Sequence, residues 1–153
     1  MFGNLKKAGG GAILRYNNGD WIASFVRKLG NTSSNLAELW ALKDGLNLAK
    51  QLNIENICVE MDVEFLIYLL SNLSVDNLIL EPLLTHCRNL MKTFPNCTVA
   101  HVYREANRCV DKLARMRADL QSDYLILYNP PPVVEDLLAS DKAGHVCNRL
   151  VVP

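Results

Sequence analysis

The sequence lacks any run of apolar residues long enough to cross a membrane, which would take about 18 or more in succession. Residues 1–7 also lack the apolar core that defines a secretory signal peptide. These two absences predict a protein that has no membrane partner and remains inside the cell.

Cysteine pairs at metal-binding spacing are absent as well. The number of cysteines is odd, and no two of them form a Cys-x-x-Cys pattern. This count and spacing suggest neither a disulfide framework nor a zinc site. The five are Cys58, Cys87, Cys97, Cys109 and Cys147. We therefore expect reduced, mostly buried thiols in a nuclear or cytoplasmic protein.

An excess of charge of one sign is the third absence. Sixteen basic residues balance sixteen acidic ones, so the net charge does not indicate a nucleic-acid partner, although local clustering matters more than the sum. Half of the 153 residues are hydrophobic and 21% are charged, which is typical of one globular domain. We expect a monomer with its domain at residues 1–122 and a C-terminal tail at residues 123–153.

Apolar periodicity predicts four strands and four helices, of which the second is short. A turn at residues 17–20, rich in Asn and Gly, joins the first two strands into a hairpin. Asn35 is expected to cap the first helix, with Glu38 as its capping-box partner. The strands are expected at residues 9–16, 21–29, 56–61 and 98–103, and the helices from residue 35 and at residues 64–70, 81–93 and 107–120. This order predicts a mixed α/β sheet with a parallel part.

Three carboxylates occupy positions where functional groups gather in α/β proteins. Glu38 is expected in the first turn of the first helix, Asp62 at the end of a central strand, and Asp111 early in the last long helix. Carboxylates held close together repel one another, and Mg²⁺ is bound through such oxygen ligands. The pattern is also compatible with a helix-capping residue, a turn residue and a surface helix residue, respectively.

Asp111 lies on a basic stripe of its predicted helix. Arg108 and Arg115 are its neighbours on the helical wheel, and Arg104 lies one turn further back. Such a stripe can follow a phosphate backbone. The alternative is a solvated helix face with ion pairs.

Five stretches of the sequence, in their order, resemble the plant-type RNase H domains of retroelement-derived, reverse-transcriptase-like proteins. These are Ala8-Gly9-Gly10-Gly11-Ala12-Ile13-Leu14-Arg15, Asn18-Gly19-Asp20-Trp21-Ile22, Asn35-Leu36-Ala37-Glu38-Leu39-Trp40-Ala41-Leu42, Val59-Glu60-Met61-Asp62 and residues 101–114. The resemblance implies an α/β fold with an RNase H-like mixed five-stranded sheet flanked by helices. It also implies four acidic residues that bind two Mg²⁺ or Mn²⁺ ions and cleave the RNA strand of an RNA–DNA hybrid.

The resemblance assigns roles residue by residue. Glu38, Asp62 and Asp111 match three of the four acidic metal ligands, and His101 matches the family's mobile catalytic histidine. Asn107 matches an asparagine that contacts nucleic acid. Three further residues are candidates for contact with the nucleic-acid backbone, namely Gly10, Arg104 and Arg108.

The fourth acidic residue of the family has no counterpart. It belongs to the family's first strand, a central one, which is expected to be truncated here, and no Asp precedes Asp20 in the hairpin turn. Three functions are therefore compatible with the sequence. They are a metal-dependent hybrid ribonuclease, a vestigial nucleic-acid-binding domain without the first catalytic Asp, and a purely structural or interaction domain.

Overall fold

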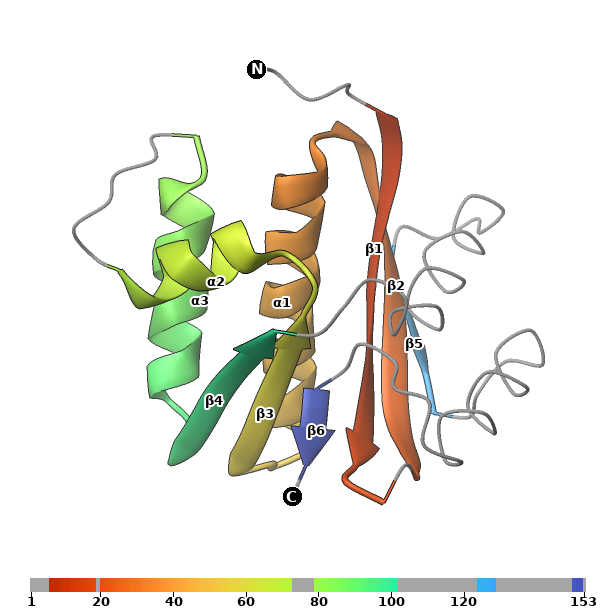
Figure 1. Ribbon diagram of the computed structural model, residues 1–153. Helices are drawn as coiled ribbons and strands as arrows, with labels where there is room; N and C mark the ends of the chain where they lie inside the picture. The colour runs from red at the N-terminus through yellow and green to blue at the C-terminus, as the bar shows by residue number, and fades with distance from the viewer. Residues whose placement is uncertain (1–5, 19, 73–78, 102–123, 129–149, 153) are drawn as a thin grey trace.

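The computed structural model of the chain describes residues 6–18, 20–72, 79–101, 124–128 and 150–152. These residues form six strands and three helices (Figure 1). In chain order they are β1 (Lys6–Tyr16), β2 (Trp21–Thr32), α1 (Ser34–Gln51), β3 (Asn56–Met61), α2 (Glu64–Ser71), α3 (Glu81–Lys92), β4 (Asn96–His101), β5 (Tyr124–Leu127) and β6 (Leu150–Val152). Within the described residues, no helix is long and apolar enough to cross a membrane.

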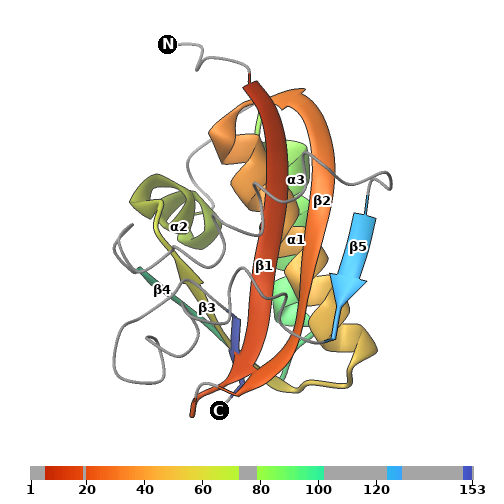
Figure 2. The same cartoon turned by 90° about the vertical axis from the view of Figure 1, so that its right-hand side faces the viewer.

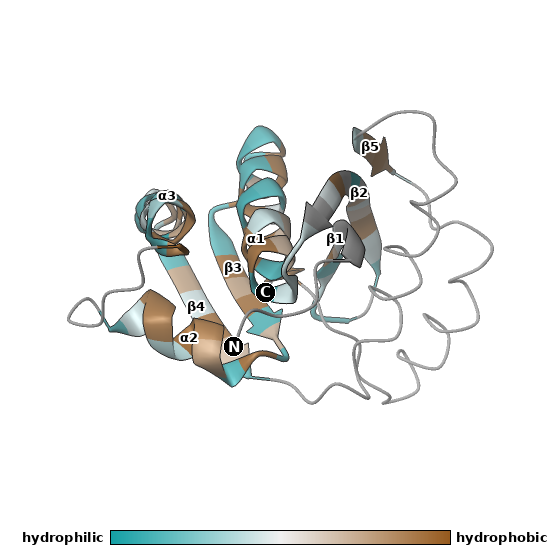
Figure 3. Cartoon of the chain, turned by 90° about the horizontal axis from the view of Figure 1, so that it is seen from above, coloured by the Kyte–Doolittle hydropathy of each residue, from teal (hydrophilic) through white to brown (hydrophobic). Residues whose placement is uncertain are grey.

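The six strands form one mixed sheet in the order β4-β3-β6-β1-β2-β5. β3 and β4 run parallel, whereas β1 and β2 form an antiparallel hairpin. α1 packs against β1, β2 and α3, and Figures 2 and 3 show α1 and α3 on the same side of the sheet. The sheet and these helices enclose a core of leucines with Phe25 and Phe94. The predicted mixed α/β sheet is therefore present.

The hairpin is longer than the apolar pattern predicted. β1 begins at Lys6 and β2 ends at Thr32, because these two residues pair across the ladder. The register shifts between Ala8 and Gly9, and Gly30 opposite Ala8 has a positive φ of 66°. Such an irregularity lets the ladder continue past the point where the side-chain alternation breaks. The turn itself is closed by Asp20, whose backbone oxygen accepts from the Tyr16 amide at 2.9 Å.

α1 begins two residues earlier than a cap at Asn35 would require. Ser33 is the capping residue, with an extended backbone and a side-chain oxygen that accepts from the Leu36 amide at 3.3 Å. The expectation that Asn35 caps this helix is wrong because Asn35 already lies inside the first turn. For the same reason Glu38 lies in the second turn instead of the first.

Replacement of Ser33 by Ala is expected to lower the free energy of unfolding by about 1 kcal/mol, because the Leu36 amide loses its acceptor. Urea denaturation of the variant and the parent measures this difference. Ser34→Ala is the matched control, since Ser34 is the exposed first residue of the same helix. Equal losses for both variants would contradict the assignment of the cap.

The predicted C-terminal tail contributes two strands to the sheet. β5 pairs with β2 at one edge, and β6 lies in the middle of the sheet between β1 and β3 (Figure 1). The described residues thus form six strands instead of the five expected. β4 is described from Asn96 to His101, and the last two residues of that predicted strand, 102 and 103, lie outside the described residues. The predicted helix at residues 107–120 lies outside the described residues.

Candidate active site

The alternation of side chains along β3 directs Asp62 away from the main core. Ile57, Val59 and Met61 are buried in the core cluster. Successive residues of a strand point to opposite faces, so Cys58 and Glu60 lie on the other face, toward which Asp62 continues the alternation. Asp62 follows directly after the last residue of the strand and is half-buried, with its Oδ1 atom fully buried.

His101 lies at the corresponding end of the neighbouring strand. It is the last described residue of β4, and its Cα partner on β3 is Met61, the residue before Asp62. Because β3 and β4 are parallel, their carboxyl ends meet at one edge of the sheet, and His101 and Asp62 are brought to the same edge. The Nδ1 atom of His101 lies 3.8 Å from Oε1 of Glu64, in the first turn of α2.

Glu38 is a half-buried residue of the second turn of α1. The N-terminal turns of α1 and the carboxyl ends of β3 and β4 point toward the same side of the molecule (Figure 1). Across the described ranges, no group of three or more His, Cys, Asp and Glu residues is arranged to hold a metal ion. Glu38 and Asp62 therefore do not form a complete ligand set with any third described residue.

Most of the residues predicted to contact nucleic acid lie outside the described part of the chain. Gly10 is described in β1, where its Cα partner is Arg27 of β2. The predicted positions of Arg104, Asn107, Arg108 and Asp111 all fall in residues 102–123, outside the described residues.

Two charged residues near the centre of the sheet were not predicted from the sequence as site residues. Arg15 of β1 is only 2% exposed, and Glu60 of β3 has a buried Oε2 atom. Burial raises the pKa of the Glu60 carboxyl, and the positive charge of Arg15 opposes that rise. The sequence signal that could have identified Glu60 is a charged residue among the apolar residues of β3. The sheet face that carries Asp62 thus also carries a buried arginine and a half-buried glutamate whose charges interact.

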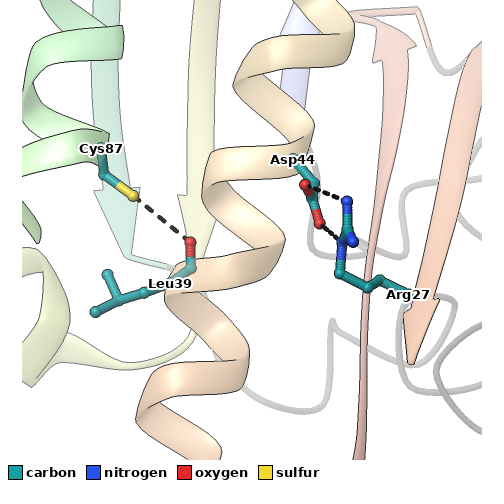
Figure 4. Close-up of polar contacts among 4 residues, drawn as sticks. All are labelled: Arg27, Leu39, Asp44 and Cys87. Atoms are coloured by element: carbon teal, nitrogen blue, oxygen red, sulfur yellow. Dashed lines mark hydrogen bonds and ion pairs between the residues drawn. The ribbon is translucent and has the colours of Figure 1, made fainter. Parts of the chain in front are cut away.

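α1 is fixed to the sheet by the ion pair between Arg27 and Asp44 (Figure 4). Arg27 donates through both Nε and Nη2 to the carboxylate, the second bond measuring 3.0 Å. Its guanidinium also lies 4.4 Å from the ring centre of Tyr124 and 5.6 Å from that of Trp40. This cluster joins α1 to β2 and β5, and so helps to fix the helix that carries Glu38.

A second contact joins α1 to α3. The thiol of Cys87 donates to the backbone oxygen of Leu39 at 3.5 Å (Figure 4). Burial raises the pKa of Cys87 to about 12, so this thiol remains protonated at neutral pH. Cys87 therefore acts as a small apolar core residue that also supplies a weak donor.

The middle of the sheet carries no carboxylate in its central strand. The position between β1 and β3 is occupied by β6, whose three residues are Leu150, Val151 and Val152. A family-type first strand would supply an acidic ligand from a central position of the sheet. β6 supplies only apolar side chains there, so the fourth ligand does not come from this strand.

Comparison with solved structures defines the class of this fold. RNase H1 of the halophilic archaeon Halobacterium salinarum superposes with a TM-score of 0.71 and 26% identity, over 78% of this chain and 91% of that one. LC11-RNase H1, solved in complex with an RNA/DNA hybrid, gives a TM-score of 0.68 and 22% identity, over 76% of this chain and 88% of that one. The chain therefore has the α/β fold of the RNase H class, as its sequence predicts.

Sequence comparison gives the family. The model of the reverse transcriptase-like family matches residues 3–117. A "putative ribonuclease H protein" of Arabidopsis thaliana is 30% identical over 149 residues, which cover 97% of this chain and 24% of that protein. The chain thus spans about a quarter of the length of this relative. It belongs to the reverse transcriptase-like family.

Proposed function

We propose that this chain hydrolyses the RNA strand of an RNA–DNA hybrid in a reaction that depends on divalent metal ions. The observation that carries the proposal is the position of Asp62, at the carboxyl end of β3 beside the end of β4, in a domain of the RNase H fold. Support for the substrate comes from LC11-RNase H1, whose structure contains an RNA/DNA hybrid.

The proposed metal ligands are carboxylates on three separate elements. Glu38 on α1 and Asp62 after β3 are the described members, and Asp111 is the third. Carboxylate oxygens suit Mg²⁺ and Mn²⁺, so the chemistry of this donor set fits the ions. When bound, the ions supply activation of the attacking water and stabilisation of the leaving oxygen.

The remaining roles belong to side chains of the chain itself. His101, at the edge that also bears Asp62, is proposed to transfer a proton during turnover, a role that histidine side chains often have in catalysis. Arg104 and Arg108 are proposed to contact phosphates. Asn107 and Gly10 are proposed to approach the backbone of the hybrid, where 2′-hydroxyls in the minor groove distinguish RNA from DNA.

The proposal places a monomer inside the cell, in the nucleus or the cytoplasm. Three cysteines in the described part of the chain are free thiols, which supports a reducing compartment. They are Cys58, Cys87 and Cys97.

Incubation of the purified chain with an end-labelled RNA–DNA hybrid tests the function. We expect cleavage of the RNA strand with Mg²⁺ or Mn²⁺, and no cleavage after chelation with EDTA, because the carboxylates need the ions to act. Duplex DNA of the same sequence is the matched control and should remain intact. Binding of the hybrid without cleavage at any Mg²⁺ or Mn²⁺ concentration would overturn the proposal, and so would cleavage that persists in EDTA.

A further inference from the structure

The middle of the sheet contains a slot one strand wide, which we define as the central slot. Its walls are Leu14–Tyr16 of β1 and Cys58–Val59 of β3, and β6 fills it. β6 runs parallel to β1 and antiparallel to β3, and Figure 1 shows it between them. Its three described residues, Leu150–Val152, pair with Leu14–Tyr16 of β1, and Leu150 and Val151 also pair with Val59 and Cys58 of β3.

One side chain anchors β6 in the core. Leu150 is 3% exposed and lies in a row across the sheet with its Cα partners Leu14 and Val59, which are also buried in the core. Gly45 of α1 makes room for it, because a Cβ atom at that position would lie 2.5 Å from Cδ1 of Leu150. The slot therefore contains a pocket for one large apolar side chain, closed from above by the helix.

The next residue of β6 belongs to the opposite face. Val151 is the Cα partner of Arg15 on one side and of Cys58 on the other. The slot thus accepts an extended segment with a large apolar residue toward α1, followed by a β-branched residue toward the other face. This is a known mode of peptide recognition, in which an extended segment is added to a sheet as a strand. Backbone hydrogen bonds hold the segment, and a pocket for a side chain makes the binding specific.

The walls of the slot are held in place independently of β6. β1 pairs with β2 along its length, and β3 pairs with β4 over all six of its residues. α1 packs against β1 and β2, and the core cluster continues from these strands to β3. A few backbone hydrogen bonds and one buried side chain are a small part of the stability of a domain. Local opening of β6 therefore does not require the two halves of the sheet to separate.

We propose that the central slot is a strand-binding site whose ligand is the chain's own C-terminal segment, Leu150–Val152, which leaves and rebinds as a unit. The binding site consists of the two strand edges and the Leu150 pocket beneath Gly45. A peptide with the same residues competes for the slot whenever β6 is out. The inference concerns occupancy of the sheet and is independent of the proposed hydrolysis.

The pairing of Val151 with Cys58 gives a direct test of the seated state. Opposed residues of an antiparallel pair have Cα separations within the range that a disulfide spans. Under a mild oxidant such as oxidised glutathione, the full-length Val151→Cys chain is expected to form a disulfide between position 151 and Cys58, located by mass spectrometry of proteolytic fragments. The same variant in a Cys58→Ser background is the matched control. No link between position 151 and Cys58 in a folded chain would overturn the proposal.

Exchange is tested on the unmodified full-length chain with a synthetic peptide of residues 148–153 that carries the Val151→Cys change. With oxidised glutathione as the oxidant, which is reduced to two glutathione thiols as the disulfide forms, we expect the peptide to become linked to Cys58 at a rate that no longer depends on peptide concentration once opening of β6 limits it. A peptide with the additional Leu150→Asp change is expected to label Cys58 more slowly by a factor of about ten or greater, because the leucine that is buried in the slot is lost. Equal labelling by both peptides, or labelling by neither, would overturn the proposal. These readouts need no activity, so they remain informative if hydrolysis is absent.

Discussion

Replacement of Asp62 by Asn is expected to reduce the rate of hybrid cleavage by more than about 100-fold, since residues that merely support metal ligands already contribute about 10–100-fold. The amide keeps the shape of the side chain but removes the negative charge that would bind the ion. Asp62 lies after the last residue of β3 and outside its core-facing row, so the fold should be unaffected. Single-turnover cleavage of an end-labelled hybrid in Mg²⁺ measures the effect.

A carboxylate near the opposite end of the same strand provides the control for Asp62. Glu55 immediately precedes β3 and is exposed. Glu55→Gln removes one negative charge, as Asp62→Asn does, but leaves the proposed metal site complete, so its cleavage rate should match that of the parent. Circular dichroism and thermal unfolding should be alike for all three proteins. Equal cleavage by Asp62→Asn and the parent would refute the assignment of Asp62 as a metal ligand.

Replacement of Asp44 by Ala is expected to have the largest effect on stability. The variant leaves Arg27 without its carboxylate partner, although that guanidinium remains between the rings of Tyr124 and Trp40. Breaking a buried pair from one side costs about 3–5 kcal/mol, and the lower end applies because the Arg27 side chain is 28% exposed. We therefore expect a loss of about 3 kcal/mol in the free energy of unfolding, measured by urea denaturation.

A double variant distinguishes loss of the pair from loss of packing. Arg27→Met combined with Asp44→Leu removes both charges, so no uncompensated charge remains and most of the lost stability should return. Gln51→Ala, at the exposed last position of the same helix, should change the free energy of unfolding by less than about 0.5 kcal/mol. A double variant no more stable than Asp44→Ala would show that the pair does not act through its charge balance.

The elements with local signals were predictable from the sequence. The hairpin follows from apolar strands on either side of an Asn- and Gly-rich turn, and β3 has the predicted bounds, residues 56–61, around its apolar run. Asp62 at the end of β3 was predictable for the same reason. The capping residue was less predictable, because Ser33 and Asn35 are both good N-caps and only the extended backbone of Ser33 decides between them.

Elements that depend on distant partners were not predictable in this way. The described residues of β6, Leu150–Val152, lie in a segment with little pattern, so the place of this strand in the middle of the sheet depends on the edges of β1 and β3 and on the space beside Gly45. The burial of Arg15 has the same origin. From the sequence, β1 is an ordinary hairpin strand. In the sheet, β1 lies next to β6, and Arg15 interacts with the charge of Glu60.

The order of the elements from β1 to β4, and the carboxylates Glu38 and Asp62 as candidates, were determined by the sequence alone, because turns, caps and apolar periodicity act over a few residues. Only the tertiary structure decided that His101 and Asp62 share one edge and that an apolar strand fills the centre of the sheet. These arrangements result from pairing between segments far apart in the chain. Such pairing depends on which strand edges and core spaces remain to be filled, and no local pattern records that.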